Sequence, residues 1–180
     1  MALAFSIAFL WLLRMGEVTK LRMKQLAILS PTLVHITFTG EESKGAQRKG
    51  EPESVAIRSR SVIACITYLK SVMGPDDFLI GGTYREKSLA LIEAASFYGV
   101  VHDRLKPHGL RRGGATWFFS IHQSYDVTCA HGRWAHVPTC RIYIDQANID
   151  LTRSELPALE KAKLKCACAN LDSLLLKAFQ

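Results

Sequence analysis

The sequence predicts an α+β fold that is mostly helical, with one small antiparallel sheet at its edge. Most of the chain repeats apolar residues at the three- and four-residue spacing typical of helices, whereas β-prone runs are confined to residues 26–58. The 180 residues are 48% hydrophobic and 22% charged and show no internal repeat, which indicates one ordinary folded domain. We expect that domain over residues 1–150 and a helical tail over residues 151–180.

The first element is predicted to be a buried helix over residues 3–14. The apolar run at 2–13 is shorter than the roughly 20 residues that a membrane-spanning helix needs. Arg14 and Glu17 stand where the small residues of a signal-peptide cleavage site would be, so neither a membrane segment nor a signal peptide is expected. A short helical turn follows over residues 17–21.

The sheet is predicted from three β-prone runs, at residues 26–29, 33–39 and 54–58. Pro31 lies in the short turn between the first two runs. The connection between the second and third runs, residues 40–52, is long and polar. It is therefore expected to be one wide loop.

Helices are expected for the rest of the chain. Pro75 ends one of them, and Pro107 and Pro138 suit the start of two others. The predicted helices cover residues 61–73, 86–98, 108–121 and 126–131, followed by a helix that starts near Pro138 and carries Tyr143, and by a last helix over about 156–179.

Charge and cysteine content indicate the kind of partner and compartment. The formal net charge of +7 and the pI of about 9.3 favour a polyanionic partner, because binding it releases counterions. The five cysteines are scattered and no secretory signal precedes them, so free thiols in a reducing compartment are expected. They are Cys65, Cys129, Cys140, Cys166 and Cys168.

Two short motifs bring together groups that suit phosphoryl transfer. His108-Gly-Leu-Arg111 places an imidazole and a guanidinium on one face at the start of a predicted helix, where the helix N-terminus favours negative charge. Farther along the chain, Trp134 precedes Tyr143 by nine residues. A guanidinium is a rigid fork of donors that matches two phosphate oxygens, and a tyrosine hydroxyl can serve as a nucleophile. The sequence therefore predicts a phosphoryl-transfer site that uses no metal and no other cofactor.

Together with Arg14-Met-Gly-Glu17, which follows an apolar helix, these motifs resemble the catalytic domain of the tyrosine recombinases, also called the phage-integrase family. The resemblance covers about residues 3–147. It implies a tyrosine-recombinase-like catalytic fold in which Arg14 is the first phosphate-binding arginine and Glu17 helps to orient it. It also implies that Arg111 is the second such arginine and that His108 assists proton transfer at the tyrosine.

The same resemblance makes Tyr143 the nucleophile, which attacks the phosphorus and leaves a 3′-phosphotyrosyl link and a free 5′ hydroxyl. The family's commoner Leu-Gly-His motif is replaced by Gly132-Arg133-Trp134. The indole N–H of Trp134 suits the histidine's role, because that role requires a donor and not a titrating base. His131 is an alternative donor, although its spacing from the tyrosine differs.

In this family a lysine in the hairpin loop of the sheet protonates the departing 5′ hydroxyl. Lys44, in Ser43-Lys44-Gly, is the best match. Lys49 is the rival, because both lysines lie between the second and third predicted strands and loop lengths vary. A lysine in such a polar loop is by itself most often a solvated charge.

A metal interpretation of the same region is weaker. Cys129-x-His131 and His136-x-x-x-Cys140 can be written as a four-ligand zinc site. The usual zinc-finger spacing is absent, however, and the tyrosine motif accounts for the same stretch. No metal ligand is therefore assigned.

The resemblance implies a site-specific DNA recombinase or integrase, of the kind that mobile elements encode, that binds double-stranded DNA as a tetramer. It places the protein inside the cell, in the cytoplasm of a prokaryote or the nucleus of a eukaryote. The family's N-terminal clamp domain has no counterpart before Arg14, so the alternatives are an inactive DNA-binding remnant of a mobile element and an enzyme like the type IB topoisomerases. The apolar tail is expected either to dock on a neighbouring subunit or to fold back on its own domain.

Overall fold

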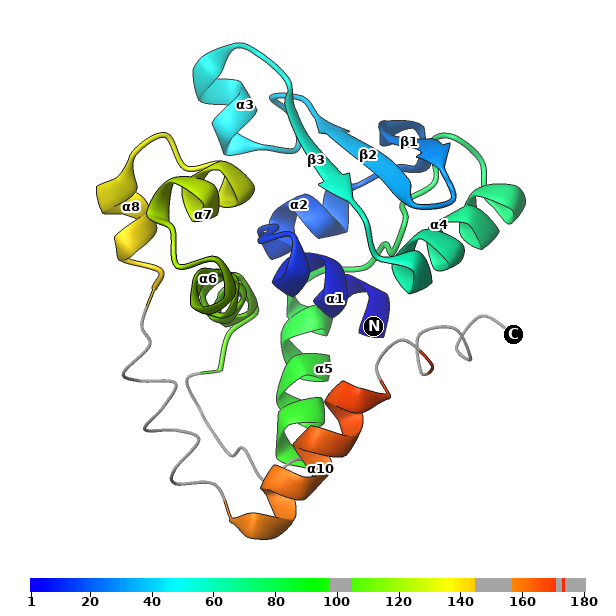
Figure 1. Ribbon diagram of the computed structural model, residues 1–180. Helices are drawn as coiled ribbons and strands as arrows, with labels where there is room; N and C mark the ends of the chain where they lie inside the picture. The colour runs from blue at the N-terminus through cyan, green and yellow to red at the C-terminus, as the bar shows by residue number, and fades with distance from the viewer. Residues whose placement is uncertain (98–104, 145–156, 171–172, 174–180) are drawn as a thin grey trace.

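The computed structural model describes residues 1–97, 105–144, 157–170 and 173, and its fold is mostly helical with one three-stranded antiparallel sheet, as the sequence predicts (Figure 1). None of the helices within these ranges is long and apolar enough to cross a membrane. The elements are α1 (Ala2–Leu10), α2 (Met15–Lys20), the 3-10 turn η1 (Met23–Gln25), β1 (Leu26–Ser30), β2 (Leu33–Phe38), α3 (Lys44–Lys49), β3 (Glu53–Ile57), α4 (Arg60–Val72), α5 (Tyr84–Phe97), α6 (His108–His122), α7 (Tyr125–Gly132), α8 (Val137–Arg141) and α10 (Ala158–Ala169).

Helix α1 lies at the centre of the molecule and contacts α2, α4 and α6 (Figure 1). Apart from Ser6 all its residues are apolar, as expected for a helix that packs against neighbours on several sides. The prediction of one helix over residues 3–14 is wrong at its end, because α1 stops at Leu10 and Leu12 has a φ of 51°. Leu12 is buried in a second core with Ala115 and Trp134, and this packing accompanies the break. The residues of α1 buried in the main core are Leu3, Ala4, Ile7 and Ala8.

The sheet has the order β1-β2-β3, with β2 in the middle. Alternate residues of β2, namely Val34, Ile36 and Phe38, are buried, because one face of the sheet rests on the core. Strand β3 alternates in the same way and pairs Glu53 with Phe38. A carboxylate therefore occupies a core-facing position at the end of the sheet.

The connection between β2 and β3 is not the wide loop that the sequence predicts, because residues Lys44–Lys49 form helix α3. Ser43 begins this helix, and its Oγ accepts a hydrogen bond from the N–H of Gly45 at 3.2 Å. Gly50 ends the helix with a φ of 70°, a conformation that glycine adopts at little cost. Lys44 thus lies in the first turn of a short helix.

Helix α6 crosses α1 at Gly114. A Cβ atom on this residue would lie 2.1 Å from the carbonyl oxygen of Phe9, so only glycine allows the two backbones to approach so closely. Helices α7 and α8 follow on the same side of the molecule (Figure 1). The prediction that Tyr143 belongs to the helix starting near Pro138 is wrong, because α8 ends at Arg141. Tyr143 follows in a tight turn, where its N–H donates to the carbonyl of Cys140 at 2.9 Å.

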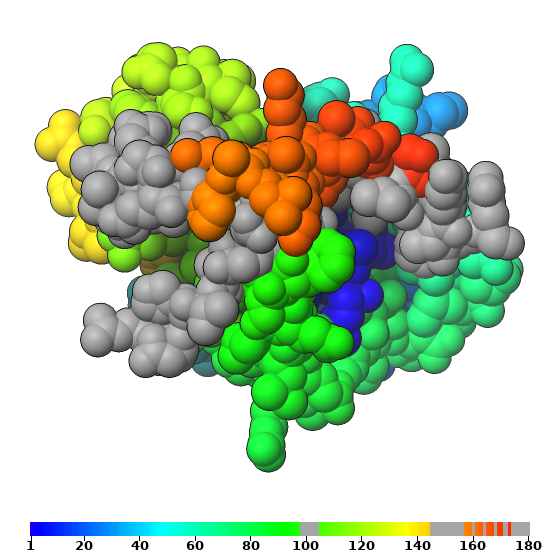
Figure 2. Space-filling model, turned by 90° about the horizontal axis from the view of Figure 1, so that it is seen from below, coloured from blue at the N-terminus to red at the C-terminus, as the bar shows by residue number. Residues whose placement is uncertain are grey.

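Helix α10 is the described part of the predicted tail. It lies on the surface beside α5 (Figures 1 and 2), where the Nζ of Lys163 is 5.7 Å from the centre of the Phe97 ring. The end of the predicted helix, to residue 179, and the apolar residues on which both docking alternatives depend are largely outside the described residues.

Candidate active site

Arg14 and Glu17 lie at the start of α2, directly after the break that follows α1. The Nη1 of Arg14 donates to Oε1 of Glu17 at 2.9 Å, and the main-chain N–H of Arg14 donates to Oε2 at 2.8 Å. The side chain of Arg14 is 36% exposed, whereas that of Glu17 is 2% exposed. A buried carboxylate thus orients a guanidinium that remains open to solvent, which is what a phosphate-binding arginine requires.

Glu17 also binds Arg133, an arginine to which the sequence motifs assign no role. The Nη2 of Arg133 donates to Oε2 of Glu17 at 2.7 Å, and the Nη1 of Arg111 lies 4.0 Å from the same oxygen. Burial by itself raises the pKa of Glu17. This effect is outweighed by the charge and hydrogen bond of Arg133, by the hydrogen bond from the N–H of Arg14 and by the charge of Arg111, so the pKa lies below its ordinary value of 4.5. Glu17 is therefore ionised at neutral pH and is shared by three arginines.

A second buried carboxylate, that of Glu53, belongs to the same cluster. The Oγ of Ser43 lies 2.8 Å from Oε2 of Glu53 and 3.3 Å from Oε1 of Glu17. The Nη1 of Arg133 is 3.5 Å from Oε2 of Glu53. Burial raises the pKa of Glu53, but the hydrogen bonds from Ser43 and Lys49 and the charge of Arg133 outweigh it and lower the pKa. Glu53 directly precedes the predicted run at 54–58, and its alternation with Val55 and Ile57 is the signal that could have identified it. Arg133 has no comparable signal.

Arg111 lies in the first turn of α6 and is completely buried. Its Nη1 donates to the carbonyl of Leu12, and its Nη2 donates to the carbonyl of Gly132 at 2.7 Å. The guanidinium carbon is 4.8 Å from the centre of the Trp134 ring and 5.9 Å from that of Tyr143. Burial is the main cause that lowers the pKa of Arg111 to about 10, so the group stays charged at neutral pH. Its Nε has no hydrogen-bond partner within the described part of the chain.

Tyr143 is half-buried between two other rings. Its ring centre is 5.4 Å from that of His108 and 4.8 Å from that of Trp134. Burial, followed by the charges of neighbouring arginines, lowers the pKa of His108, so its imidazole is neutral at neutral pH and can accept a proton. The indole N–H of Trp134 is buried and has no hydrogen-bond partner among the described residues. A phenol, a neutral imidazole and an unpaired N–H donor therefore share one small region.

The two candidate lysines lie at opposite ends of α3. Lys44 lines a hollow together with Arg14 and Glu17. The Nζ of Lys49 instead pairs with Oε1 of Glu53 at 3.1 Å. Lys44 is thus the lysine beside the first candidate phosphate-binding arginine, whereas Lys49 is engaged with a buried carboxylate.

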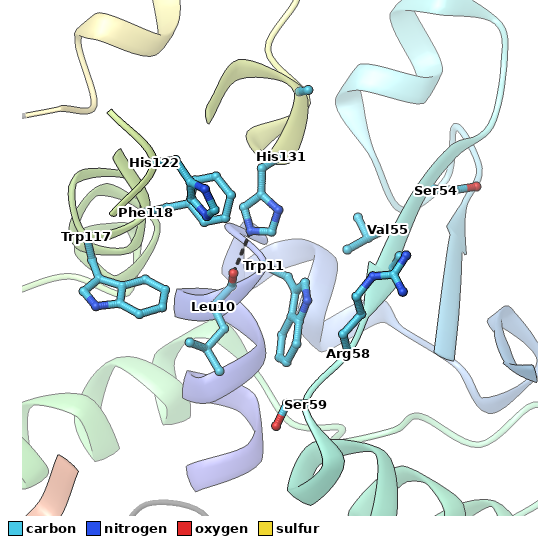
Figure 3. A pocket seen from close by; sticks show the side chains of 12 residues that line it. Leu10, Trp11, Ser54, Val55, Arg58, Ser59, Trp117, Phe118, His122 and His131 are labelled. Carbon is cyan, nitrogen blue, oxygen red and sulfur yellow. Dashed lines mark hydrogen bonds between the residues drawn. The ribbon is translucent and has the colours of Figure 1, made fainter. Parts of the chain in front are cut away.

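His131, the alternative to Trp134 as a donor, points into a different hollow between α1, β3 and α6 (Figure 3). Its Nε2 is hydrogen-bonded to the carbonyl of Leu10 at 2.7 Å, and its ring stacks on Phe118 with 4.0 Å between centres. Tyr143 does not line this hollow. The geometry therefore favours Trp134 as the donor near the tyrosine.

The residues that can be written as a zinc site do not gather around one point. Among the residues that the structure describes, no three His, Cys, Asp or Glu side chains are placed to hold a metal ion. Cys129 and Cys140 instead pack together in the second core, and burial, with a hydrogen bond between the two thiols, raises the pKa of Cys140 to about 12. Among the described residues neither forms a disulfide bond, and nor do Cys65 and Cys166.

The fold is tyrosine-recombinase-like. Two similar solved structures are of the XerH site-specific recombinase, one bound to the difH substrate in a pre-cleavage complex and one bound to a palindromic difH substrate in a post-cleavage complex. The TM-scores are 0.61 and 0.62, each at 18% sequence identity, and the matches cover 79% and 86% of this chain. The chain spans only 41% and 43% of the lengths of those proteins. Comparison of the sequence with protein-family models and with curated proteins finds no match.

Proposed function

We propose that this protein breaks and rejoins DNA strands at a specific site, through a covalent link between Tyr143 and a DNA phosphate. The observation that carries this proposal is the convergence of His108, Arg111 and Trp134 on Tyr143, from α6 and from the segments on either side of α8. The similar solved structures are recombinase complexes with DNA, which supports DNA as the substrate. The net charge of +7 agrees with a polyanionic partner.

The first chemical step is attack by the Tyr143 hydroxyl on the phosphorus. A protonated phenol is a weak nucleophile, so the neutral imidazole of His108 takes up the proton as the bond to phosphorus forms. The bond from phosphorus to the 5′ oxygen breaks, and Lys44 gives a proton to that oxygen. The products are a 3′-phosphotyrosyl link and a free 5′ hydroxyl. Attack by a 5′ hydroxyl on the phosphorus of this link then breaks its bond to the Tyr143 oxygen and restores the DNA backbone, while Lys44 takes the hydroxyl proton and His108 returns its proton to Tyr143.

The two candidate arginines differ in how they reach the phosphate. Arg14 is partly exposed and already oriented by Glu17, so it can bind a phosphate oxygen without rearrangement. Arg111 is buried, with both Nη atoms bound to main-chain carbonyls. In the proposed reaction a phosphate oxygen replaces one of these carbonyls, and the Tyr143 ring moves aside to admit it. Both guanidinium groups then stabilise the charge of the pentacoordinate transition state.

A second candidate function is DNA binding without cleavage. It is favoured by the complete burial of Arg111, since a guanidinium that never reaches a phosphate cannot stabilise the charge that develops when Tyr143 attacks.

Recombination also requires two DNA duplexes, and we propose a DNA-bound tetramer for it. Relaxation of supercoiled plasmid without a specific site would instead indicate the topoisomerase-like alternative.

The test is covalent capture on a pool of nicked duplexes of randomised sequence, in which the short 5′-hydroxyl fragment diffuses away after cleavage. We expect an adduct that survives denaturing electrophoresis, is lost in Tyr143→Phe and persists in Tyr125→Phe, a control tyrosine on α7. An adduct that persisted in Tyr143→Phe would contradict the assignment. Salt-dependent DNA binding with no adduct from the wild type would favour the non-cleaving candidate.

A further inference from the structure

The active-site cluster contains two buried carboxylates that share their partners. Glu17 and Glu53 are 2% and 6% exposed. One hydroxyl, that of Ser43, lies within hydrogen-bond distance of both, although it has only one proton to donate. Two buried carboxylates this close oppose each other's ionisation unless a cation lies between them. Arg133 contacts both, at 2.7 Å and 3.5 Å.

The backbone of Arg133 is in an unusual conformation for its residue type. It follows the last residue of α7 with a φ of 57°, a left-handed conformation that costs an L-residue with a side chain more than it costs glycine. The side chain is 7% exposed and lies against the ring of Phe38, 5.1 Å from its centre. The strained backbone thus directs a guanidinium into the interior, to the two carboxylates.

The short segment around Arg133 contacts both candidate phosphate-binding arginines. The Gly132 carbonyl accepts a hydrogen bond from Arg111, and the Trp134 ring covers the Arg111 guanidinium. The Arg133 side chain reaches Arg14 through Glu17, which accepts hydrogen bonds from both. The Arg133 guanidinium is itself paired with Glu17 and Glu53.

We propose that Arg133 is a positioning residue, which holds Glu17 and Glu53 side by side as carboxylates and so fixes the guanidinium of Arg14 at the phosphate site. The role of Arg14 rests on the proposed function, whereas the pairing of the carboxylates does not. Without Arg133, Glu17 and Glu53 are left to compete for the hydroxyl of Ser43, and Glu17 turns away from Arg14.

Other charged groups face the two carboxylates and limit what the loss of Arg133 does. In the intact protein Glu17 also contacts Arg14 and Arg111, and Glu53 also contacts Lys49. The hollow beside Glu17 is also lined by Lys20, Lys44, Glu41 and Glu42. The remaining cations reduce the mutual repulsion of the carboxylates, but among the cations that the structure describes only Arg133 contacts both.

The decisive variant is Arg133→Gly, because glycine suits the positive φ and any loss then comes from the side chain. We expect adduct formation to slow by about 100-fold, the scale of a misplaced catalytic group, with DNA affinity and its salt dependence unchanged. Arg133→Gly combined with Glu53→Gln restores most of the rate, because one charge is removed along with the arginine. Arg22→Ala is the matched control, since Arg22 also stacks on a phenylalanine, Phe78, but at a distant place.

Two readouts decide the proposal even if the wild type forms no adduct, an outcome that contradicts only the proposed function. The first is the order of the Arg14 guanidinium by nitrogen-15 relaxation, which falls in Arg133→Gly and recovers with Glu53→Gln. The second is urea unfolding, which measures how much free energy of unfolding Arg133→Gly loses relative to the wild type. This penalty shrinks as the pH is lowered from about 7 to 4, because without Arg133 the carboxylates take up protons at a higher pH than in the wild type. An unchanged Arg14, or a penalty that is equal at every pH and is not rescued by Glu53→Gln, would overturn the proposal.

Discussion

Replacement of Glu17 by glutamine should be among the most destabilising isosteric changes in this protein. The carboxylate is almost completely buried and accepts hydrogen bonds from the side chain and N–H of Arg14 and from Arg133. Glutamine has nearly the same volume, so the change removes the charge and replaces one acceptor with an NH₂ donor that faces a guanidinium. The buried guanidinium groups of Arg111 and Arg133 then lack their shared counter-ion.

The expected cost follows from the number and burial of these groups. Removing one partner of a buried ion pair costs about 3–5 kcal/mol, because an uncompensated charge is left in the interior. With a urea dependence of about 2 kcal/mol per molar, the unfolding midpoint should fall by roughly 1.5–2.5 M. A typical domain is stable by about 5–15 kcal/mol, so the variant should still fold in the absence of denaturant.

Urea unfolding at neutral pH, followed by circular dichroism, measures this shift. Glu42→Gln is the matched control, because Glu42 also accepts hydrogen bonds from a residue three positions earlier, Thr39, but these hydrogen bonds are exposed to solvent. Its midpoint should move by less than about 0.5 M, as exposed ionic contacts contribute little. If the Glu17→Gln midpoint lay within 0.5 M of that of Glu42→Gln, the cluster would not stabilise the fold as argued.

Two further predictions concern the helix crossing and the pH dependence of stability. Gly114→Ala should destabilise the protein by about 1–3 kcal/mol, because the new Cβ meets the Phe9 carbonyl where two helix backbones are in contact. Gly109→Ala lies on the same helix, with no atom within 4 Å of its Cβ, and should be neutral or stabilising. Equal urea midpoints for the two variants would refute the argument that Gly114 is needed at the helix crossing. Folding lowers the pKa values of Glu17 and Glu53, so their contribution to stability is present above the ordinary value of 4.5 and is lost as the pH falls through the lower values of the folded state. Measurement of the urea midpoint as the pH is lowered should show this loss of stability. The double variant Glu17→Gln, Glu53→Gln should show a smaller loss.

The parts of the fold that the sequence predicted correctly are those set by local periodicity. The alternation of Val34, Ile36 and Phe38 allows one face of β2 to be buried, whatever lies beneath it. The start of α6 at His108 is likewise marked by the adjacent Pro107. These features depend on a few neighbouring residues, so the mostly helical fold with a three-stranded sheet was predictable.

The errors fall where distant segments decide the backbone. The apolar run from α1 continues past Leu10, but Leu12 leaves the helix and packs in the second core with residues more than a hundred positions away. The polar connection after β2 contains a buried helix cap, Ser43, whose hydroxyl lies against Glu17 and Glu53. No pattern of neighbouring residues in the sequence predicts such contacts.

Residue identity and spacing are local properties, so the chemical groups of the candidate site and their order along the chain could be predicted before the fold was known. Which of these groups meet depends on the folded chain: it buries Arg111 beneath Trp134 and Tyr143, brings Lys44 to the hollow that Arg14 lines, and engages Lys49 with Glu53. It also brings Arg133 to the two buried carboxylates. Such contacts arise because buried charges must find partners wherever the fold supplies them, and those partners lie far away in the sequence.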